Sequence, residues 1–422
     1  MLVLVRVARS AGAALLGAGL ALVPAAAMAD GDGAQWEPAP EAVGDSANWQ
    51  PDAAGPEHMK PFYDLDWSLG LRGSYSRDSV TGDHYKTEAL PSVTLTHTGD
   101  LLSYHASADA DVSRTDSGAI NIDQARLSAG TALQFDPKTS LTTNATFAIT
   151  QEDPNAPDVA SDTVATPVEY SGTADSTWTQ SIGRINVSLT GNAGREVFGP
   201  TTLTGGVIQD NASQNNTYGG TGLRLGFQLT PVLEPFVSGN IIRTVFDQPS
   251  PSLSTKLDGN LYTLMAGVSA KWDDRLTASV SAGIAKEHFD DGTLADVNAT
   301  LYDASLTYKP TDVLTLNGAF TTTLGAPGPT GSGTAKIDYE ATANATYLVN
   351  DWLQWRGTAG WHNATYADSS GTDTGYTFGV GADYLINTHA KLSADYGFEH
   401  AEVTPNPVAD IHTVTLGVTF QK

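Results

Sequence analysis

Apolar and polar residues alternate along almost the whole chain after residue 62. The stretch LSYHASADADVS is typical, because Tyr104, Ala106, Ala108, Ala110 and Val112 share one parity while polar residues fill the other. A period of two predicts a β-strand with two chemically different faces. The apolar parity holds mostly small side chains, which offer little to a packed interior. This face therefore needs an apolar environment other than a tightly packed core.

The same alternation predicts about 18 strands of roughly ten residues between Tyr63 and Lys422, with 16 strands as the alternative. A tilted strand that crosses a bilayer needs about 9–11 residues. Long helical patterns are missing, and no stretch after the N-terminus is apolar enough for a membrane helix. The fold class is therefore all-β, and each strand is long enough to span a membrane.

The connections between the predicted strands alternate in length. One set is short and bears Asp, Pro, Asn or Gly, as in FDPKTS and KPTDV, whereas the other set is long and polar, as in residues 151–167 and 199–215. A propeller repeats at a similar period but needs four strands per blade. Two strands per repeat indicate an up-and-down antiparallel β-barrel, which leaves no strand edge in hydrocarbon. An even number of strands puts both ends of the chain in the periplasm, together with the short turns, and the long loops outside the cell.

The N-terminus has the three-part layout of a secretory signal. Arg6 and Arg9 precede an apolar run that is too short to span a bilayer, and the small residues after it predict cleavage after Ala29. Residues 30–62 are rich in Asp, Pro, Ala and Gly without periodicity and are predicted to be a periplasmic linker. The predicted organisation is thus a signal peptide over 1–29, a linker over 30–62 and a barrel over 63–422.

Composition narrows the function classes. The formal net charge is −25 and removal of the basic leader makes it more negative, which argues against nucleic-acid binding. The chain has no cysteine, which excludes disulfides, thiolate metal ligands and a lipoprotein anchor. Hydrophobic residues make up only 40% of it, which is little for ordinary soluble cores of this size.

Several charged residues fall on the polar parity of the predicted strands. A charge that faces lipid at mid-bilayer costs about 2–4 kcal/mol for Arg or Lys, so these side chains are predicted to face the lumen. Two interpretations stay open: charged rings that set ion selectivity, or salt bridges across the wall. The lumen-facing candidates are Arg72, Arg126, Arg224, Lys309, Arg356, Asp109, Asp111, Asp303, Asp383 and Asp395.

Aromatic residues gather near the predicted strand ends. Tyr and Trp prefer the headgroup depth of a bilayer, although aromatic residues of a sandwich core are the alternative. The final strand HTVTLGVTF ends near the C-terminus in an aromatic residue, as is common in outer-membrane proteins. The interfacial candidates are Trp67, Trp178, Trp272, Tyr308, Tyr347, Trp352, Trp355 and Phe420.

No constellation for catalysis or metal binding stands out. His105, Asp109 and Asp111 share a strand face, but the first and last are roughly 20 Å apart, so a metal site needs ligands from another strand. EF-hand and HExxH spacings do not occur. The sequence therefore predicts no catalytic residues, no metal site, no cofactor and no enzyme.

Strand–turn units such as ASLTYKPTDVLTLNGAF, VSAKWDDRLTASVSAGI and ADYLINTHAKLSADYGFEH resemble the β-barrel porin type two family of Gram-negative outer-membrane proteins. The resemblance covers residues 63–422. It implies an outer-membrane pore, sometimes discussed alongside polysaccharide export, and brings no catalytic residues.

Together these features predict an outer-membrane, porin-like channel for passive diffusion or export of hydrophilic solutes. The alternative is a non-conducting structural, adhesin or receptor barrel with acidic extracellular loops. The expected partners are outer-membrane lipid, lipopolysaccharide and the barrel-assembly machinery, without nucleic acid. The substrate, the oligomeric state and whether the lumen is open or plugged do not follow from the sequence.

Overall fold

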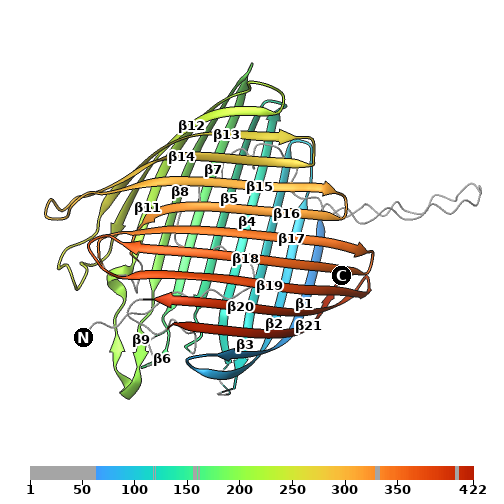
Figure 1. Ribbon diagram of the computed structural model, residues 1–422. Helices are drawn as coiled ribbons and strands as arrows, with labels where there is room; N and C mark the ends of the chain where they lie inside the picture. Colours follow the sequence, from blue (N-terminus) through green and yellow to red (C-terminus); the bar gives the residue numbers. More distant parts are fainter. Residues whose placement is uncertain are drawn as a thin grey trace, which may run out of the picture.

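The computed structural model describes residues 63–116, 118, 120–154, 159, 162–327, 333–403 and 408–422. The predicted leader and linker lie outside these residues. Eighteen strands form one antiparallel sheet (Figure 1). They are β1 (Asp64–Asp78), β2 (Gly82–His97), β3 (Leu102–Thr115), β4 (Ile120–Asp136), β5 (Thr139–Gln151), β7 (Val168–Ile182), β8 (Ile185–Phe198), β11 (Asn216–Phe227), β12 (Leu233–Phe246), β13 (Gly259–Trp272), β14 (Leu276–Phe289), β15 (Val297–Thr311), β16 (Leu314–Gly325), β17 (Lys336–Asn350), β18 (Leu353–Tyr366), β19 (Thr372–Asn387), β20 (Ala390–Val403) and β21 (Ala409–Gln421).

The sheet closes on itself. β1 pairs with β2 on one side and with the last strand, β21, on the other, in a continuous register from Ser68 opposite Gln421 to Asp78 opposite Ile411. Each remaining strand pairs with the strands before and after it around the barrel. In Figure 1 the strands β14–β20 cross in front of β3–β8, as the near and far walls of a tilted-strand barrel do. The prediction of an 18-stranded up-and-down barrel is confirmed.

The eight short turns meet at one end of the barrel, here called the short-turn end. They lie between strand pairs β2–β3, β4–β5, β7–β8, β11–β12, β13–β14, β15–β16, β17–β18 and β19–β20, at the places where the sequence predicts them. β1 begins and β21 ends at this same end.

The opposite end, here called the long-loop end, is less uniform than the sequence indicates. Residues 152–167 and 199–215 contribute β6 (Thr163–Ala165), β9 (Thr201–Leu203) and β10 (Ile208–Gln209), which form a separate three-stranded sheet. This sheet stands away from the barrel in Figure 1. However, β1 and β2 are joined only by residues 79–81. Long loops are thus concentrated on one side of the barrel mouth, from β5 to β17.

The strands are longer than predicted. They run from 12 residues in β11 and β16 to 17 in β4, whereas about ten were expected. Since about 9–11 tilted residues cross the hydrocarbon, the wall continues beyond the membrane. A cluster of buried apolar residues lies near the long-loop ends of β12–β17: Phe246, Leu257, Met265, Ala285, Phe289, Val297, Leu301, Leu324 and Ala335. The extended strand ends therefore have a small core of their own.

The two faces of the wall differ as the alternation predicts. Large apolar residues on one parity are exposed, as Leu69 and Leu71 on β1 or Leu264 and Val268 on β13 show. Such a continuous exposed apolar surface requires lipid rather than water. Among the described residues, no helix is long and apolar enough to cross a membrane.

Candidate functional site

The parity opposite the exposed apolar residues lines the barrel interior. Register transfers this assignment from strand to strand, because residues paired across a ladder point to the same face. Arg72 on β1 is opposite Glu88 on β2. On this basis all ten lumen-facing candidates lie on the inner parity. The inner wall is thus the candidate functional site.

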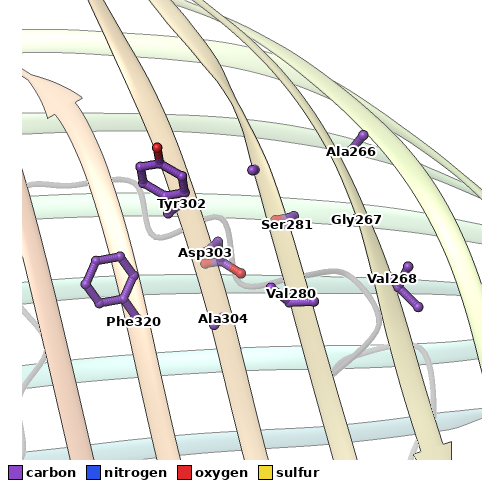
Figure 2. Close-up of a pocket in the computed structure, with 10 residues that line it drawn as sticks. Ala266, Gly267, Val268, Val280, Ser281, Tyr302, Asp303, Ala304 and Phe320 are labelled. Carbon is purple, nitrogen blue, oxygen red and sulfur yellow. The ribbon is translucent and has the colours of Figure 1, made fainter.

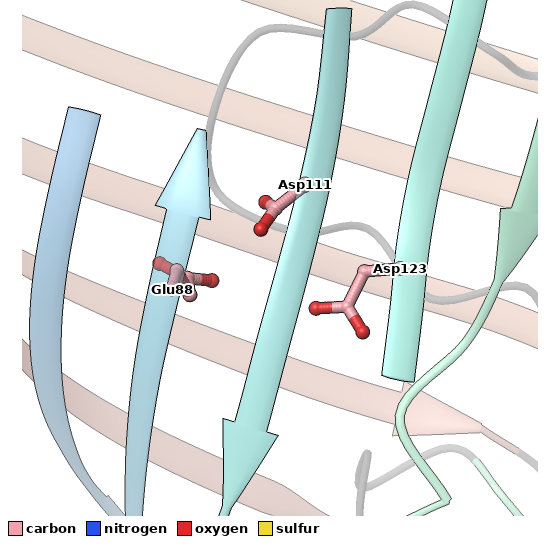
Figure 3. Close-up of side chains that lie close together, drawn as sticks. All are labelled: Glu88, Asp111 and Asp123. Atoms are coloured by element: carbon pink, nitrogen blue, oxygen red, sulfur yellow. The ribbon is translucent and has the colours of Figure 1, made fainter. Parts of the chain in front are cut away.

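The first group of inner charges spans β1 to β4, and Figure 3 shows its three carboxylates. Arg72 Nε lies 3.0 Å from Glu88, and Arg72 Nη2 lies 3.5 Å from Asp111. Lys86 Nζ lies 3.0 Å from Glu88 and 2.6 Å from Asp123. A bulge in β4 opposite Asp111 and Val112 gives room for the Asp123 side chain on this face. Five charges thus form one network, of which the sequence singled out only Arg72 and Asp111.

Glu88, Asp111 and Asp123 each offer an oxygen within 4.8 Å of the others, which is close enough for a cation. Figure 3 shows the three carboxylates on neighbouring strands. The ammonium of Lys86 and the guanidinium of Arg72 already supply positive charge to all three. The group therefore acts as an ion-pair network with one excess negative charge.

The second group lies near the short-turn end of β11–β13. Arg224 Nη1 pairs with Glu234 at 2.7 Å, Arg224 Nη2 donates to Ser269 at 3.1 Å, and the guanidinium stacks 4.1 Å above the Phe236 ring. Asn186 on β8 also donates to Glu234. Arg224 is buried, so its charge is compensated within the wall instead of projecting into the lumen.

The third group joins β18, β19 and β20. Arg356 Nε lies 3.0 Å from Asp383, and Arg356 Nη2 lies 2.7 Å from Asp395. Lys391 adds a longer contact of 3.8 Å to Asp383. Here one arginine bridges two carboxylates from two following strands.

The remaining candidates are not brought into such groups. Arg126 on β4 is directly opposite Asp109 on β3 in the register. Lys309 lies near the short-turn end of β15, where its backbone N–H donates to Arg275 O at 2.7 Å. Asp303 sits between Ser281 and Thr321 in the register, and among the described residues no ion pair reaches it.

Inner-face glycines let these long side chains lie flat against the wall. A Cβ added to Gly381 would overlap Asp395 and crowd Arg356, and one added to Gly130 would overlap the His105 ring. Gly226 leaves the same space for Glu234. Glycine lacks the atoms that would lift a neighbouring side chain away from the sheet. The charged groups therefore occupy the wall and leave the lumen clear of their bulk.

The interfacial aromatic candidates all lie near the short-turn end. Trp67 opens β1, Phe420 closes β21, and Trp272 and Trp352 stand at turns. A second aromatic set lies toward the long-loop end on β18 to β20, with Trp361, Tyr376 and Phe398 on the outward parity. On β19, Tyr376 and Tyr384 are eight residues apart, roughly 26 Å along the strand. The wall therefore carries two aromatic levels, one toward each end of the barrel.

The acidic partners are the residues that sequence reasoning missed. Glu88, Glu234 and Asp123, with the cation Lys86, complete the networks but were not singled out. Alternation alone places Glu88 and Glu234 on the polar parity. Their contact with a particular arginine depends on register, which the sequence pattern does not specify.

Comparison with solved structures finds outer-membrane barrels of low sequence identity. A mutant of the ferric enterobactin receptor PfeA from Pseudomonas aeruginosa is 9% identical, over 85% of this chain and 80% of that one, with a TM-score of 0.46. OpdL of the same organism is 12% identical over 85% and 98% of the two chains, with a TM-score of 0.43. OpdK, solved with vanillate, is 10% identical over 85% and 99%, also with a TM-score of 0.43.

None of the curated proteins compared with this chain matches it. The family model described as "Putative beta-barrel porin 2" matches residues 83–422, which is most of the barrel. The chain belongs to this porin-like family of outer-membrane β-barrels.

Proposed function

We propose that this barrel is a non-enzymatic, passive channel for hydrophilic solutes. The observation that carries the proposal is the arrangement of the inner wall, where long charged side chains pair with neighbours and lie over glycines. A barrel of 16–18 strands encloses an aqueous lumen when nothing fills it. A wall built this way keeps that lumen wide.

The solutes are proposed to be neutral or positively charged. On β5, β7 and β8 the inner face is mainly hydroxyl and amide groups, with Thr177 bonded to Thr190, Thr179 to Ser188 and Asn144 to Asp175. Such a surface suits polyhydroxy solutes, including polysaccharide chains. It offers many weak hydrogen bonds rather than one tight site, as passage through a channel requires.

Cation preference follows from the networks. The group on β1–β4 holds three carboxylates for two cations, whereas the group around Arg356 is balanced, with Arg356 and Lys391 for two carboxylates. The arginines therefore do not form a basic stripe, because acids pair with Arg72, Arg224 and Arg356, and Arg126 lies opposite Asp109 in the register. A wide lumen is screened over about 8 Å at physiological ionic strength, so the preference is modest and depends on salt.

The direct test is single-channel conductance in planar bilayers, with the reversal potential measured across a salt gradient. We expect an open channel that weakly favours cations. The combined variant R72Q/R126Q/R224Q/R356Q should strengthen the cation preference, because carboxylates lose their partners. Absence of conductance would overturn the proposal, and a shift of the variant toward anions would overturn the charge assignment.

Sidedness is part of the proposal. The long-loop end faces outside the cell, and the linker 30–62 and the short turns face the periplasm, after cleavage of the leader at Ala29. Epitope tags in 199–215 should label on intact cells, while tags at Pro137 or Asp312 should not. The reverse labelling would show that the barrel is inverted.

A receptor function is a second candidate, favoured by the three-stranded sheet at the long-loop end. Val164, Val207 and Ile208 on or beside this sheet are exposed apolar side chains. Exposed apolar residues on a projecting element are typical of contact surfaces. A closed lumen in the conductance experiment would favour this function over the channel.

A further inference from the structure

Beyond transport, the outer wall has a groove within the band that faces lipid. The groove has a volume of about 650 Å³ and spans β13 to β16 (Figure 2). Two cross-strand rows form it: Ala266, Ala282 and Tyr302 in one, and Val268, Val280, Ala304 and Phe320 in the other. In Figure 2 the Tyr302 and Phe320 rings flank one side and Val268 the other. The alanines create a trough between the larger side chains of Tyr302, Phe320 and Val268.

A polar cluster lies on the same outward face, toward the long-loop end. Lys286 is four residues beyond Ala282 on β14, roughly 13 Å along the strand, with one apolar row, Leu264 and Ile284, between them. The next row beyond Lys286 joins Arg243, Asn260 and His288 on β12, β13 and β14. Groove and cluster are thus aligned along the same strands.

Loop carboxylates orient these cations without using all their donors. Arg243 Nη1 donates to Asp290 at 2.6 Å, and Asp296 lies 2.7 Å from both Lys286 Nζ and His288 Nδ1. Both aspartates come from the β14–β15 loop beyond the strand ends, so they approach from the side away from the membrane. The guanidinium has five N–H donors and the ammonium three, so several remain for a ligand on the membrane side.

We infer that this groove and cluster form a seat for lipid A, the phosphorylated and acylated anchor of lipopolysaccharide. An acyl chain lies in the trough, while its phosphates accept hydrogen bonds from Arg243, Lys286 and His288. Arginine and lysine are the usual phosphate ligands in proteins, and basic pockets beside apolar walls bind lipid headgroups. The site depends on the proposed sidedness, which puts the cluster at the outer leaflet, but not on conduction.

The width of the cluster selects lipid A over a simple phospholipid. From Arg243 on β12 to Asn298 on β15 the polar groups cross four strands, roughly 14 Å at the usual strand spacing. A single phosphate would contact only part of this span. A disaccharide that carries a phosphate at each end fills it, and Asn260 and Asn298 add donors and acceptors for its sugars.

The test is binding of defined lipids to the purified, delipidated barrel, measured by native mass spectrometry. The probes are bis-phosphorylated lipid A, its fully dephosphorylated form, and phosphatidylglycerol. We expect one tightly bound lipid A per barrel, and binding about tenfold or more weaker for the dephosphorylated form. R243Q/K286Q should lose binding to a similar degree, while R77Q, which removes an exposed cation at the same end of β1, should bind as wild type.

A second variant separates the seat from any disturbance of the loop. Ala282→Phe fills the trough without a change in charge, and it should weaken lipid A binding several-fold. Wild-type binding by both R243Q/K286Q and Ala282→Phe would overturn the inference, as would equal binding of phosphatidylglycerol or of dephosphorylated lipid A. Conductance of the same preparations reports the channel separately, so either proposal fails without the other.

Discussion

Two sectors of the barrel wall differ in the side chains that line their inner faces. On β12–β15 many inner side chains toward the long-loop end are apolar and buried, with Phe246, Met265 and Phe289 in one cluster close to the buried Glu287. On β18–β20 and on β1–β4 the inner face is instead built from ion pairs around Arg356 and Arg72. Both sectors have the same outward alternation, so the difference lies only on the side that lipid does not touch.

This difference shows that the side chains on the outer and inner faces of a barrel are under separate physical constraints. Lipid demands an apolar outer face everywhere, but the inner face has only to satisfy its polar groups. Where the strands carry long loops, the wall extends beyond the bilayer and packs a core with loop residues such as Leu257. Where the connections are short, as between β1 and β2, paired charges line the wall instead. The first sector therefore forms a packed rim, and the second keeps paired charges along its inner face.

Truncation of a buried aromatic side chain in the apolar cluster of β12–β15, here called the packed sector, should cause the largest loss of stability. Phe289 is 3% exposed, and truncation of a buried Phe to Ala costs about 3–5 kcal/mol because it loses apolar burial and leaves a cavity. Urea unfolding of Phe289→Ala in lipid vesicles measures this loss. The matched variant Phe378→Ala, on the lipid face of β19, should lose clearly less. Equal losses would show that the cluster is not a packed core.

A charge placed on either face of β4 probes the two environments directly. Leu127 is 57% exposed on the lipid parity, while the Ser128 hydroxyl shares a hydrogen bond with Ser107 on the inner face. Leu127→Arg should destabilise the barrel by about 2–4 kcal/mol if it lies near the midplane. Ser128→Arg should cost far less, because its charge meets water. The same unfolding experiment compares them, and similar values would refute the face assignment.

The sequence predicts the lipid-facing half of this architecture and the topology, but not the inner contacts. Alternation and turn residues such as Pro137 and Asp312 suffice because lipid imposes one rule on every strand. The partners of Arg72 lie 16 and 39 positions away, and they meet it only through the register of β1, β2 and β3. The apolar cluster was not predicted either, and its one signal in the sequence is the pair Leu253 and Leu257 in a loop that is otherwise largely polar.

Replacement of an inner-face glycine beside the ion pairs of β18–β20 should have a smaller effect on stability. Gly381→Val should push Arg356 and Asp395 away from the wall, because its Cβ would overlap the carboxylate. Overpacking of this kind costs about 1–3 kcal/mol, and the displaced side chains should lower single-channel conductance. Gly397→Val on β20 is the matched control, since a Cβ there meets nothing within 4 Å. A conductance loss in the control but not in Gly381→Val would contradict the proposed role of the glycine.

The smallest expected effect is on the hydrogen bonds that hold the 247–258 and 290–296 loops together at the long-loop end. Hydrogen bonds from Thr255 and Thr293 lower the pKa of Asp291 from 3.8 to about 2, and those from Arg243 lower the pKa of Asp290. A carboxyl group whose pKa is lowered on folding stabilises the fold above its ordinary pKa, and that contribution disappears as the pH falls through the lowered value. The contacts between the 247–258 and 290–296 loops should therefore weaken between about pH 4 and pH 2.

Pepsin, which is active in this range, can measure the release of these loops. We expect cleavage in 247–258 or 290–296 to rise as the pH falls toward 2, while the strands stay resistant. Asp291→Asn should raise the susceptibility of these loops to a neutral protease at pH 7, because it removes the charged acceptor of the Thr255 and Thr293 hydroxyls. If both loops stay protected in acid and in the variant, the apolar contacts of Leu253 and Leu257 hold them alone. The packed sector would then depend on burial at its rim as well as within its core.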